Sequence, residues 1–385
     1  MRRHIREGSS GEPIACVIGE IDLLRSLALA GIRCALVAHR GDLARFSRAA
    51  TTRIDLPHHS PPSAFADLLI AWARAQPARP VLFYDGDWDL LMVSEYRNRL
   101  REAFQFVIPE HALVLDLVDK SRFARLAEAR GLPVPRAVAL DPDSTDAIDL
   151  RYPIILKPLT RHHDSWKPLS DRKAIRADTP ADFRRIRLQL GEGGLRVLAQ
   201  ELIPGPERLI ESYHVYADEA GQIVGEFTGR KIRTYPLEHG YSTALETSDA
   251  PDVRALGRDV IDRINFSGVA KLDFKRHPDT GELFLLEINP RFSLWQHLGA
   301  KAGVNLAHAV YTDLTGARRP PMGRARPGVR WVSIPSDLRA ARAEGIPFTS
   351  WLSWMIKCQA KHGFAWDDPL PLVAGFIQRV ARRGP

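Results

Sequence analysis

The sequence predicts an α/β protein, in which a doubly wound parallel sheet precedes an α+β core. In the first part, up to about residue 118, short apolar runs typical of buried strands alternate with longer helical patterns. In the middle part, apolar and polar residues alternate along paired runs joined by glycine-containing turns, which is typical of hairpin strands. The two patterns together predict a mixed fold with more than one sheet.

The first part contains five expected elements. They are strands over 14–20, 32–38 and 80–87, and helices over 21–31 and 63–76. Only Gly19 follows the first strand, so the three-glycine fingerprint of NAD-binding proteins is absent, which argues against an NAD site. A different ligand site above the carboxyl ends of these strands stays open.

The middle part begins with an amphipathic helix, for which Asp119 is the expected N-cap and Gly131 the expected stop. A buried strand follows and ends near Lys157. The remaining expected elements are a helix near 179–190, strands over 194–207, 209–218 and 223–236, a helix over 251–264, and a hairpin over 272–291. These elements predict a sheet-rich core after the parallel domain.

The last part contains a helical stretch over 293–316, a Pro/Arg-rich linker over 317–328, and two helices rich in tryptophan. The run 370–383 is basic and amphipathic, and such a helix can lie on an anionic membrane. We expect this helix to pack its apolar face on its own domain, and membrane contact stays the open alternative.

The composition limits the function without choosing it. The chain has 385 residues, 45% of them hydrophobic, and a formal net charge of +8. This size is sufficient for two or three compact units, and the charge suits nucleotides, nucleic acid or an anionic membrane surface. Much of the excess charge is arginine in an alanine-rich chain, so genome composition explains it equally well.

Cysteine usage predicts a reducing compartment. Cys16, Cys34 and Cys358 lie among apolar residues and form no CxxC pair, so we expect buried thiols rather than disulfides or zinc ligands. No apolar run approaches the length of a membrane span, and the basic start is followed by no long apolar core. The expected location is the cytoplasm. The histidines show no HExxH spacing and no P-loop motif occurs.

The hairpin over 272–291 carries the most specific chemistry. If His277 and Leu283 close its loop, Asp273 lies opposite Glu287, at a separation where two carboxylates repel and weaken a sheet. One face then carries Lys271, Asp273, Lys275, Glu287, Asn289 and Arg291, and the other carries Leu272, Phe274, Leu286 and Ile288. Another interaction must therefore offset the repulsion between the carboxylates of Asp273 and Glu287.

Asp273, Glu287 and Asn289 form a set of oxygen ligands that suits Mg²⁺ or Mn²⁺, and a divalent ion would turn the repulsion into coordination. Arg291 points the same way and can hold a phosphate by a two-pronged contact. The alternative is a solvated polar face on which lysines neutralise the acids. Spacing alone leaves both interpretations open.

A second cationic segment lies at 229–242. Alternation sends Lys231 and Arg233 to one face of a strand and Arg230 to the other, ahead of a loop that contains His239. These side chains could hold a phosphate or an acid substrate. An outer strand rich in arginine is the competing interpretation.

The motifs together resemble the ATP-grasp superfamily. "LLEINPR" after an acidic strand is similar to its metal-binding signature, and Lys120 and Lys157 match its two nucleotide-binding lysines. The segment 200–207 resembles its adenine-reading hinge, and the strands before residue 90, including 46–57, resemble its preceding domain. The resemblance extends over residues 14–315, with the motifs in the family's order.

The resemblance implies roles for individual residues. Gln200, Glu201 and Ile203 would contact adenine, and Glu207 the ribose. Lys120 and Lys157 would bind the phosphates, and Arg291, Lys157 and Lys231 would be catalytic. Asp273, Glu287 and Asn289 would bind Mg²⁺ or Mn²⁺ with ATP. One departure is the loop 160–168, which has no glycine where the family often has a glycine-rich lid; Arg161, His162, His163 and Lys167 could take its place.

The resemblance also implies a domain plan and a reaction. A pre-ATP-grasp domain (1–118) would precede an ATP-grasp domain (119–316), with lobes over about 119–198 and 199–316, and a tail (317–385). The implied function is that of a carboxylate–amine ligase of the D-aspartate ligase-like type, joining a small acid to an amine through an acyl phosphate. Carboxylation or phosphorylation by the same fold, and a non-catalytic nucleic-acid-binding protein, are the alternatives; nucleic acid is not the expected partner.

Overall fold

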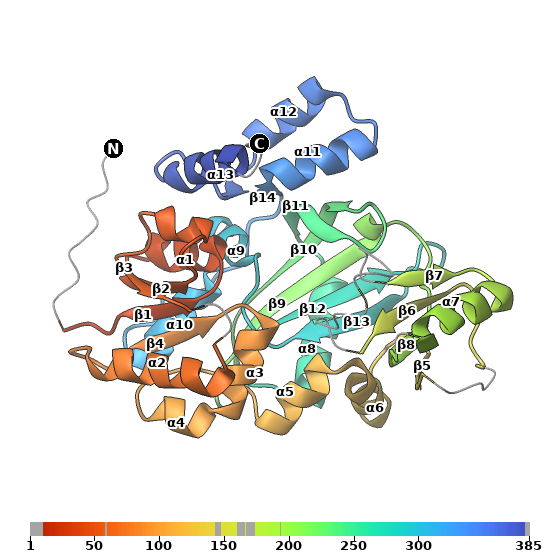
Figure 1. Ribbon diagram of the computed structural model, residues 1–385, viewed down its shortest axis with the longest axis horizontal. Helices are drawn as coiled ribbons and strands as arrows, with labels where there is room; N and C mark the ends of the chain where they lie inside the picture. Colours follow the sequence, from red (N-terminus) through yellow and green to blue (C-terminus); the bar gives the residue numbers. More distant parts are fainter. Residues whose placement is uncertain are drawn as a thin grey trace.

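The first sheet of the molecule is parallel and lies at one end of it (Figure 1). The computed structural model describes residues 11–57, 60–142, 148–159, 166, 174–192 and 194–381. The strand order is β3-β2-β1-β4, from β1 (Ala15–Ile18), β2 (Cys34–Ala38), β3 (Thr52–Asp55) and β4 (Val81–Tyr84). The accompanying helices are α1 (Ile21–Leu29), the short 3-10 turn η1 (Leu43–Phe46), α2 (Pro62–Arg74), α3 (Asp87–Glu95), α4 (Arg97–Arg101) and α5 (His111–Val118).

The predicted parallel sheet is therefore confirmed, with β3 as an additional edge strand that was not predicted. In β3 only Ile54 is buried, so this strand lacks the apolar run that identifies the inner strands. A close approach shapes the carboxyl ends of β1 and its neighbour β4, the second edge strand. A Cβ at Gly19, after β1, would lie 2.5 Å from Oδ1 of Asp85, after β4, so glycine lets this carboxylate lie against the end of β1.

The second sheet is small and antiparallel, with the order β5-β8-β6-β7. Its strands are β5 (Ala137–Leu140), β6 (Ile154–Pro158), β7 (Ile175–Ala177) and β8 (Val197–Glu201), and its helices are α6 (Lys120–Arg130) and α7 (Pro180–Glu192). The predicted cap of α6 is confirmed, because Asp119 accepts hydrogen bonds from the backbone N–H groups of Ser121 and Arg122. Gly131 ends the helix in the left-handed conformation with φ 58°.

The third sheet has seven strands in the order β13-β12-β9-β10-β11-β14-β15 and runs diagonally through the centre of the molecule (Figure 1). Its strands are β9 (Ile210–Ala217), β10 (Ile223–Tyr235), β11 (Tyr241–Ser248), β12 (Gly268–Arg276), β13 (Leu283–Asn289), β14 (Arg330–Ser333) and β15 (Ala360–His362). The associated helices are η2 (Glu207–Leu209), α8 (Pro251–Arg263), α9 (Gln296–Ala302), α10 (Leu306–Thr315), α11 (Ile334–Ala343), α12 (Phe348–Ile356) and α13 (Leu370–Ala381).

The hairpin β12–β13 has the predicted pairing of Asp273 with Glu287, but the register changes towards the turn. A bulge in β13 makes Phe274 pair with Leu285, so Arg276, not His277, pairs with Leu283. Leu285 is consequently fully buried with the core side chains. Leu286, which alternation placed on that core face, lines the cavity described below instead. The core face predicted for Leu286 is therefore wrong, because Leu286 is the extra residue of the bulge.

The last part of the chain differs from the predicted pair of helices. Among the described residues it forms α11, α12 and α13 and also two strands, β14 and β15, which extend the sheet beyond β11. The division at residues 118, 198 and 316 stays a prediction. No helix in the described ranges is both long enough and apolar enough to cross a membrane.

Candidate active site

A cavity of about 1610 Å³ is lined by residues of the small sheet, of the seven-stranded sheet, and of the segments that follow β1 and β4 of the parallel sheet. The structure brings to its wall the eleven residues for which the resemblance implies nucleotide-binding, metal-binding or catalytic roles. These residues are Lys120, Lys157, Gln200, Glu201, Ile203, Glu207, Lys231, Asp273, Glu287, Asn289 and Arg291. They are separated by up to 171 positions in the chain (291 minus 120), so the fold, not local sequence, assembles them.

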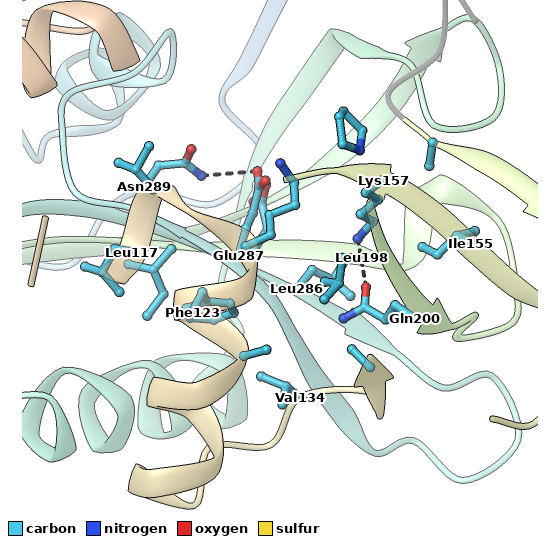
Figure 2. Close-up of a pocket in the computed structure, with 18 of the residues that line it drawn as sticks. Leu117, Phe123, Val134, Ile155, Lys157, Leu198, Gln200, Leu286, Glu287 and Asn289 are labelled. Atoms are coloured by element: carbon cyan, nitrogen blue, oxygen red, sulfur yellow. Dashed lines mark hydrogen bonds between the residues drawn. The ribbon is translucent and has the colours of Figure 1, made fainter. Parts of the chain in front are cut away.

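One end of the cavity is apolar. Figure 2 shows side chains from α5, α6, the segment between α6 and β5, β6, β8 and the hairpin around the same space. They are Leu117, Phe123, Val134, Ile155, Leu198 and Leu286. The residue displaced by the bulge, Leu286, thus forms part of this apolar wall, beside the strand end at Gln200 and Glu201. This part of the cavity, called the apolar slot below, suits the apolar faces of a heterocycle.

Lys157, at the end of β6, is held between the apolar slot and the acids of the hairpin. Its Nζ donates a hydrogen bond of 2.8 Å to Oε1 of Gln200 (Figure 2). Burial lowers the pKa of Lys157, while the carboxylates of Glu287 and Glu207 act in the opposite direction. A cation in this position is suited to bind an anion that enters the cavity.

If the cavity binds the MgATP that the resemblance implies, replacement of Lys157 by alanine should weaken that binding by about tenfold to a hundredfold, because charge-assisted hydrogen bonds contribute about 1.5–3 kcal/mol. Isothermal titration calorimetry measures the change. The exposed Lys357, after α12, provides a matched Lys→Ala control that should keep the wild-type affinity. Equal affinities of all three proteins would make Lys157 a structural residue.

Glu201, at the end of β8, is engaged by a neighbouring arginine. Arg151 donates to both carboxylate oxygens of Glu201, through its backbone N–H at 3.0 Å and its guanidinium at 3.0 and 3.2 Å. Burial raises the pKa of Glu201, but the bonds from Arg151 outweigh burial and the pKa is lowered overall. The side chain of Glu201 therefore has a structural partner. We expect a ligand in the cavity to contact the backbone of the chain near the end of β8 instead of this carboxylate.

A cluster of basic side chains surrounds Glu207. Lys231 Nζ and His239 Nδ1 each lie 3.9 Å from a carboxylate oxygen of Glu207. Lys275 is also buried at the cavity wall, where burial lowers its pKa and Glu207 opposes that effect. The sequence analysis treated Lys275 only as a partner for the hairpin acids and assigned no role to His239. The strand face that Lys275 shares with Asp273 could have indicated Lys275. His239 lies in the loop between β10 and β11, where no pattern in the sequence indicated a role.

Arg230 and Arg233, the other cations of β10, bind carboxylates elsewhere. Arg230 donates to Glu246 at 2.9 Å, and Arg233 makes bonds of 2.8 and 2.7 Å to the two oxygens of Asp337, a fully buried carboxylate on α11. Neither arginine lines the large cavity. These two arginines therefore have structural partners, whereas Lys231 lies at the cavity wall. The alternative of an outer strand is wrong, because β10 is the central strand of the seven-stranded sheet.

The oxygen-bearing residues of the hairpin face the same cavity. Asp273 pairs with Glu287 across the strands, and Asn289 Nδ2 donates to Glu287 Oε1 at 3.1 Å (Figure 2). Asp273 also accepts from Ser212 and from Lys271 Nζ, the latter at 2.6 Å. Two carboxylates and an amide oxygen at one cavity wall are a donor set that fits a hard divalent cation. No cluster of His, Cys, Asp and Glu alone forms a metal site within the described ranges.

Beyond the hairpin, the cavity reaches the first sheet and becomes acidic. Arg291 donates to Asp87, at the start of α3, which lines the cavity together with Glu20, Asp85 and Trp88. Burial raises the pKa of Asp85 to about 7 and that of nearby Asp89 to about 6. The sequence analysis left a site above these strand ends open but named none of these acids. The run "DGD" directly after a buried strand was the available signal.

The proposed phosphate lid over 160–168 falls almost wholly outside the described residues, and this includes Arg161, His162, His163 and Lys167. Trp166 is described, and it is buried at the wall of the cavity.

Comparison with known proteins identifies the architecture. No protein-family model matches the chain. The D-aspartate ligase of Enterococcus faecium is 22% identical over 284 residues, which cover 70% of this chain and 67% of that enzyme. The N5-carboxyaminoimidazole synthetase of Staphylococcus aureus has a similar structure, with a TM-score of 0.65, 15% identity, and coverage of 87% of this chain and 85% of that one.

An L-amino acid ligase from Bacillus licheniformis is also similar, with a TM-score of 0.62, 12% identity, and coverage of 80% of this chain and 75% of that one. The Staphylococcus aureus synthetase has also been solved in complex with ADP, and that structure matches with a TM-score of 0.60. These similarities confirm the fold class expected from the motifs.

Proposed function

We propose that this chain, which belongs to the ATP-grasp superfamily, is an ATP-dependent ligase that joins a small carboxylic acid to an amine. The observation that supports this function most strongly is the division of charge along one cavity. Cations and the hairpin's oxygen ligands occupy its middle, and carboxylates of the first sheet occupy its far end. An anionic triphosphate and a cationic ammonium group therefore have separate, complementary places in one cavity.

In this proposal the adenine base of ATP lies in the apolar slot beside Leu286 and meets the strand end over 200–203. Lys157, Lys231 and Lys275 bind the phosphates, and Glu207 binds the ribose. Asp273, Glu287 and Asn289 would hold a divalent ion, which neutralises phosphate charge when bound. The residues of the chain thereby position the terminal phosphate and exclude water from it.

The acid substrate attacks the terminal phosphate of ATP, giving an acyl phosphate and ADP. Arg291 neutralises the charge that develops on the transferring group. The amine then displaces inorganic phosphate and forms the amide. The acidic end of the cavity binds the amine as its ammonium form, and the Asp85 carboxylate accepts the proton that the amine must lose before it attacks.

The function is tested by screening pairs of amino acids and small acids for ADP release that depends on both partners. Hydroxylamine should replace the amine and yield a hydroxamate, with one ADP formed per product. ADP release that requires bicarbonate instead of an amine would assign a carboxylation reaction and contradict the proposal. Binding of nucleic acid that ignores MgATP and weakens steeply with salt would indicate a non-catalytic protein instead.

The acidic end of the cavity makes a specific prediction about pH. Because the pKa of Asp85 is raised to about 7, this carboxylate is ionised at pH 8 and mostly neutral at pH 6. The KM for the amine should therefore rise by about tenfold between pH 8 and pH 6. The KM for the acid substrate, measured in parallel, should change little.

Asp85→Asn should raise the KM for the amine at pH 8 and remove most of its dependence on pH. The exposed Asp67→Asn, on α2, is the matched control and should keep the wild-type profile. A KM for the amine that stays flat from pH 6 to pH 8 in the wild-type enzyme would show that this end of the cavity does not bind the ammonium group.

A further inference from the structure

Helix α13 turns its small side chains toward the protein and its large apolar side chains toward solvent, which is the reverse of an ordinary surface helix. The side chains turned toward the protein are Pro371, Ala374, Gly375 and Gln378. The exposed side chains are the large apolar ones: Leu370, Leu372, Val373, Phe376 and Ile377. Phe376 is 70% exposed and Ile377 is 60% exposed. A helix that only covers its own domain buries its largest apolar residues.

The small residues let α13 lie close to the first domain. A Cβ at Gly375 would lie only 3.1 Å from Cδ1 of Leu43 in η1, and Gln378 donates a hydrogen bond of 3.1 Å to the carbonyl oxygen of Gly41. Figure 1 shows α13 at the top of the molecule, beyond α1 and β3. Leu43 and Phe46, which are themselves partly exposed, continue the apolar surface beside the helix.

A buried ion pair fixes the segment that leads into α13. Arg25 on α1 bonds to Asp368 at 2.9 Å, with 6% of each side chain exposed. Asp368 also accepts from Ser47 Oγ at 2.6 Å and from the backbone N–H of Arg48 at 3.0 Å. A pair this well buried and hydrogen-bonded is costly to open, so the start of the helix is held in place. The exposed apolar residues are therefore presented by a fixed support.

The surroundings of this face are aromatic and basic. Trp366, just before the helix, is 86% exposed. From residue 369 to residue 385 the sequence contains no acidic residue, and Arg379, Arg382 and Arg383 occur at its end. An exposed apolar helical face, preceded in the sequence by an aromatic residue and followed in the sequence by arginines, has the composition of helices that lie in the interface of an anionic bilayer.

We propose that the face formed by Trp366, Leu370, Leu372, Val373, Phe376 and Ile377 docks on an anionic membrane surface. Its apolar side chains enter the boundary between headgroups and acyl chains, and the arginines meet the negative headgroups. A second copy of the chain fits this face less well. A dimer requires about 800 Å² from each partner, more than one face of a twelve-residue helix supplies, and would bring like-charged arginines together.

The test uses the full-length chain and sedimentation with vesicles. The wild-type protein should bind phosphatidylcholine–phosphatidylglycerol vesicles, and binding should weaken as salt is added. Phosphatidylcholine vesicles alone should bind at least about tenfold more weakly, because interaction with anionic lipid contributes about 1 kcal/mol for each arginine near the surface. Phe376→Asp should lower binding to the mixed vesicles by at least about tenfold, because an apolar contact is replaced by a like-charged one.

Leu188→Asp is the matched control, since Leu188 is an equally exposed apolar residue (73%) on α7, far from this face in the sequence. It should bind like the wild type. Arg382→Gln with Arg383→Gln should weaken binding only to vesicles that contain phosphatidylglycerol. Circular dichroism should show both Asp variants folded, because the replaced side chains are exposed.

Several outcomes would overturn the proposal. The wild-type protein could remain in the supernatant with both kinds of vesicle, bind both equally, or bind no less after Phe376→Asp. Analytical ultracentrifugation, which measures the oligomeric state, tests for one further outcome that would contradict it. A wild-type dimer that Phe376→Asp converts to a monomer would assign the face to self-association.

Discussion

Arg291→Ala should lower kcat by about 10²–10³-fold and leave the dissociation constant of MgATP within about twofold of the wild-type value. Arg291 lies at the boundary between the hairpin and the acidic end of the cavity, where phosphate would pass from ATP to the acid substrate. Charge develops there only during transfer, so the guanidinium stabilises the transition state more than bound ATP. Rapid-quench measurement of ADP formation and calorimetry of MgATP binding separate the two effects.

Two further variants make this assignment sharper. Arg291→Lys should recover part of the lost rate, because an ammonium keeps the charge but not the planar fork. Asp87→Asn should lower kcat less than Arg291→Ala does, because Asp87 acts by positioning the guanidinium that donates to it. If ADP and amide form at the wild-type rate in the Arg291→Ala enzyme, this arginine has no part in the mechanism.

Glu287→Gln and Asp273→Asn should each lower turnover by at least about 10³-fold, because each removes a charged ligand from the proposed metal site. Their effects on stability should differ. Cross-strand repulsion alone would let both variants keep or gain stability. In the structure, however, Asp273 accepts from Ser212 and from the largely buried ammonium of Lys271. Its replacement leaves that ammonium without its carboxylate.

Asp273→Asn should therefore lower the free energy of unfolding by about 1–3 kcal/mol, which is the cost of an impaired bond to a buried charge. Glu287→Gln should leave it nearly unchanged. Thermal melting without ligands measures both, and Glu282→Gln, an exposed residue of the same hairpin, is the control for turnover and for melting. A Glu287→Gln enzyme with full activity would remove this hairpin from the active site.

The sequence predicted most of the secondary structure because the periodicities are strong and their ends are marked. Asp119 and Gly131 bound α6 as expected, since capping depends on local chemistry alone. The pairing of Asp273 with Glu287 followed from strict alternation about one turn. The assembly of the candidate site residues depended on resemblance, because residues spread over two sheets, a helix and the intervening loops share no local pattern.

Other features depend on contacts that a single sequence does not display. The bulge at Leu286 inserts one residue without changing the apolar pattern "LFLLEI", so alternation placed this side chain on the wrong face. β14 and β15 have only four and three residues, too few to show a period, and their pairing is long-range. The acids at the end of β4 resemble an ordinary loop until the fold places Arg291 beside them.

Asp22 and Arg25 fasten the beginning of the chain to its end. Asp22, fully buried on α1, accepts from Trp331 Nε1 at 3.0 Å and pairs with His362 Nδ1 at 2.7 Å, and Arg25 holds Asp368. These buried contacts join the parallel sheet to the seven-stranded sheet, and the two sheets form one unit with the hairpin acids and Arg291. Lys157 belongs to the small antiparallel sheet, which takes part in neither set of contacts. If the site closes on a nucleotide, we expect the small sheet to move with Lys157 while the hairpin acids and Arg291 keep their places.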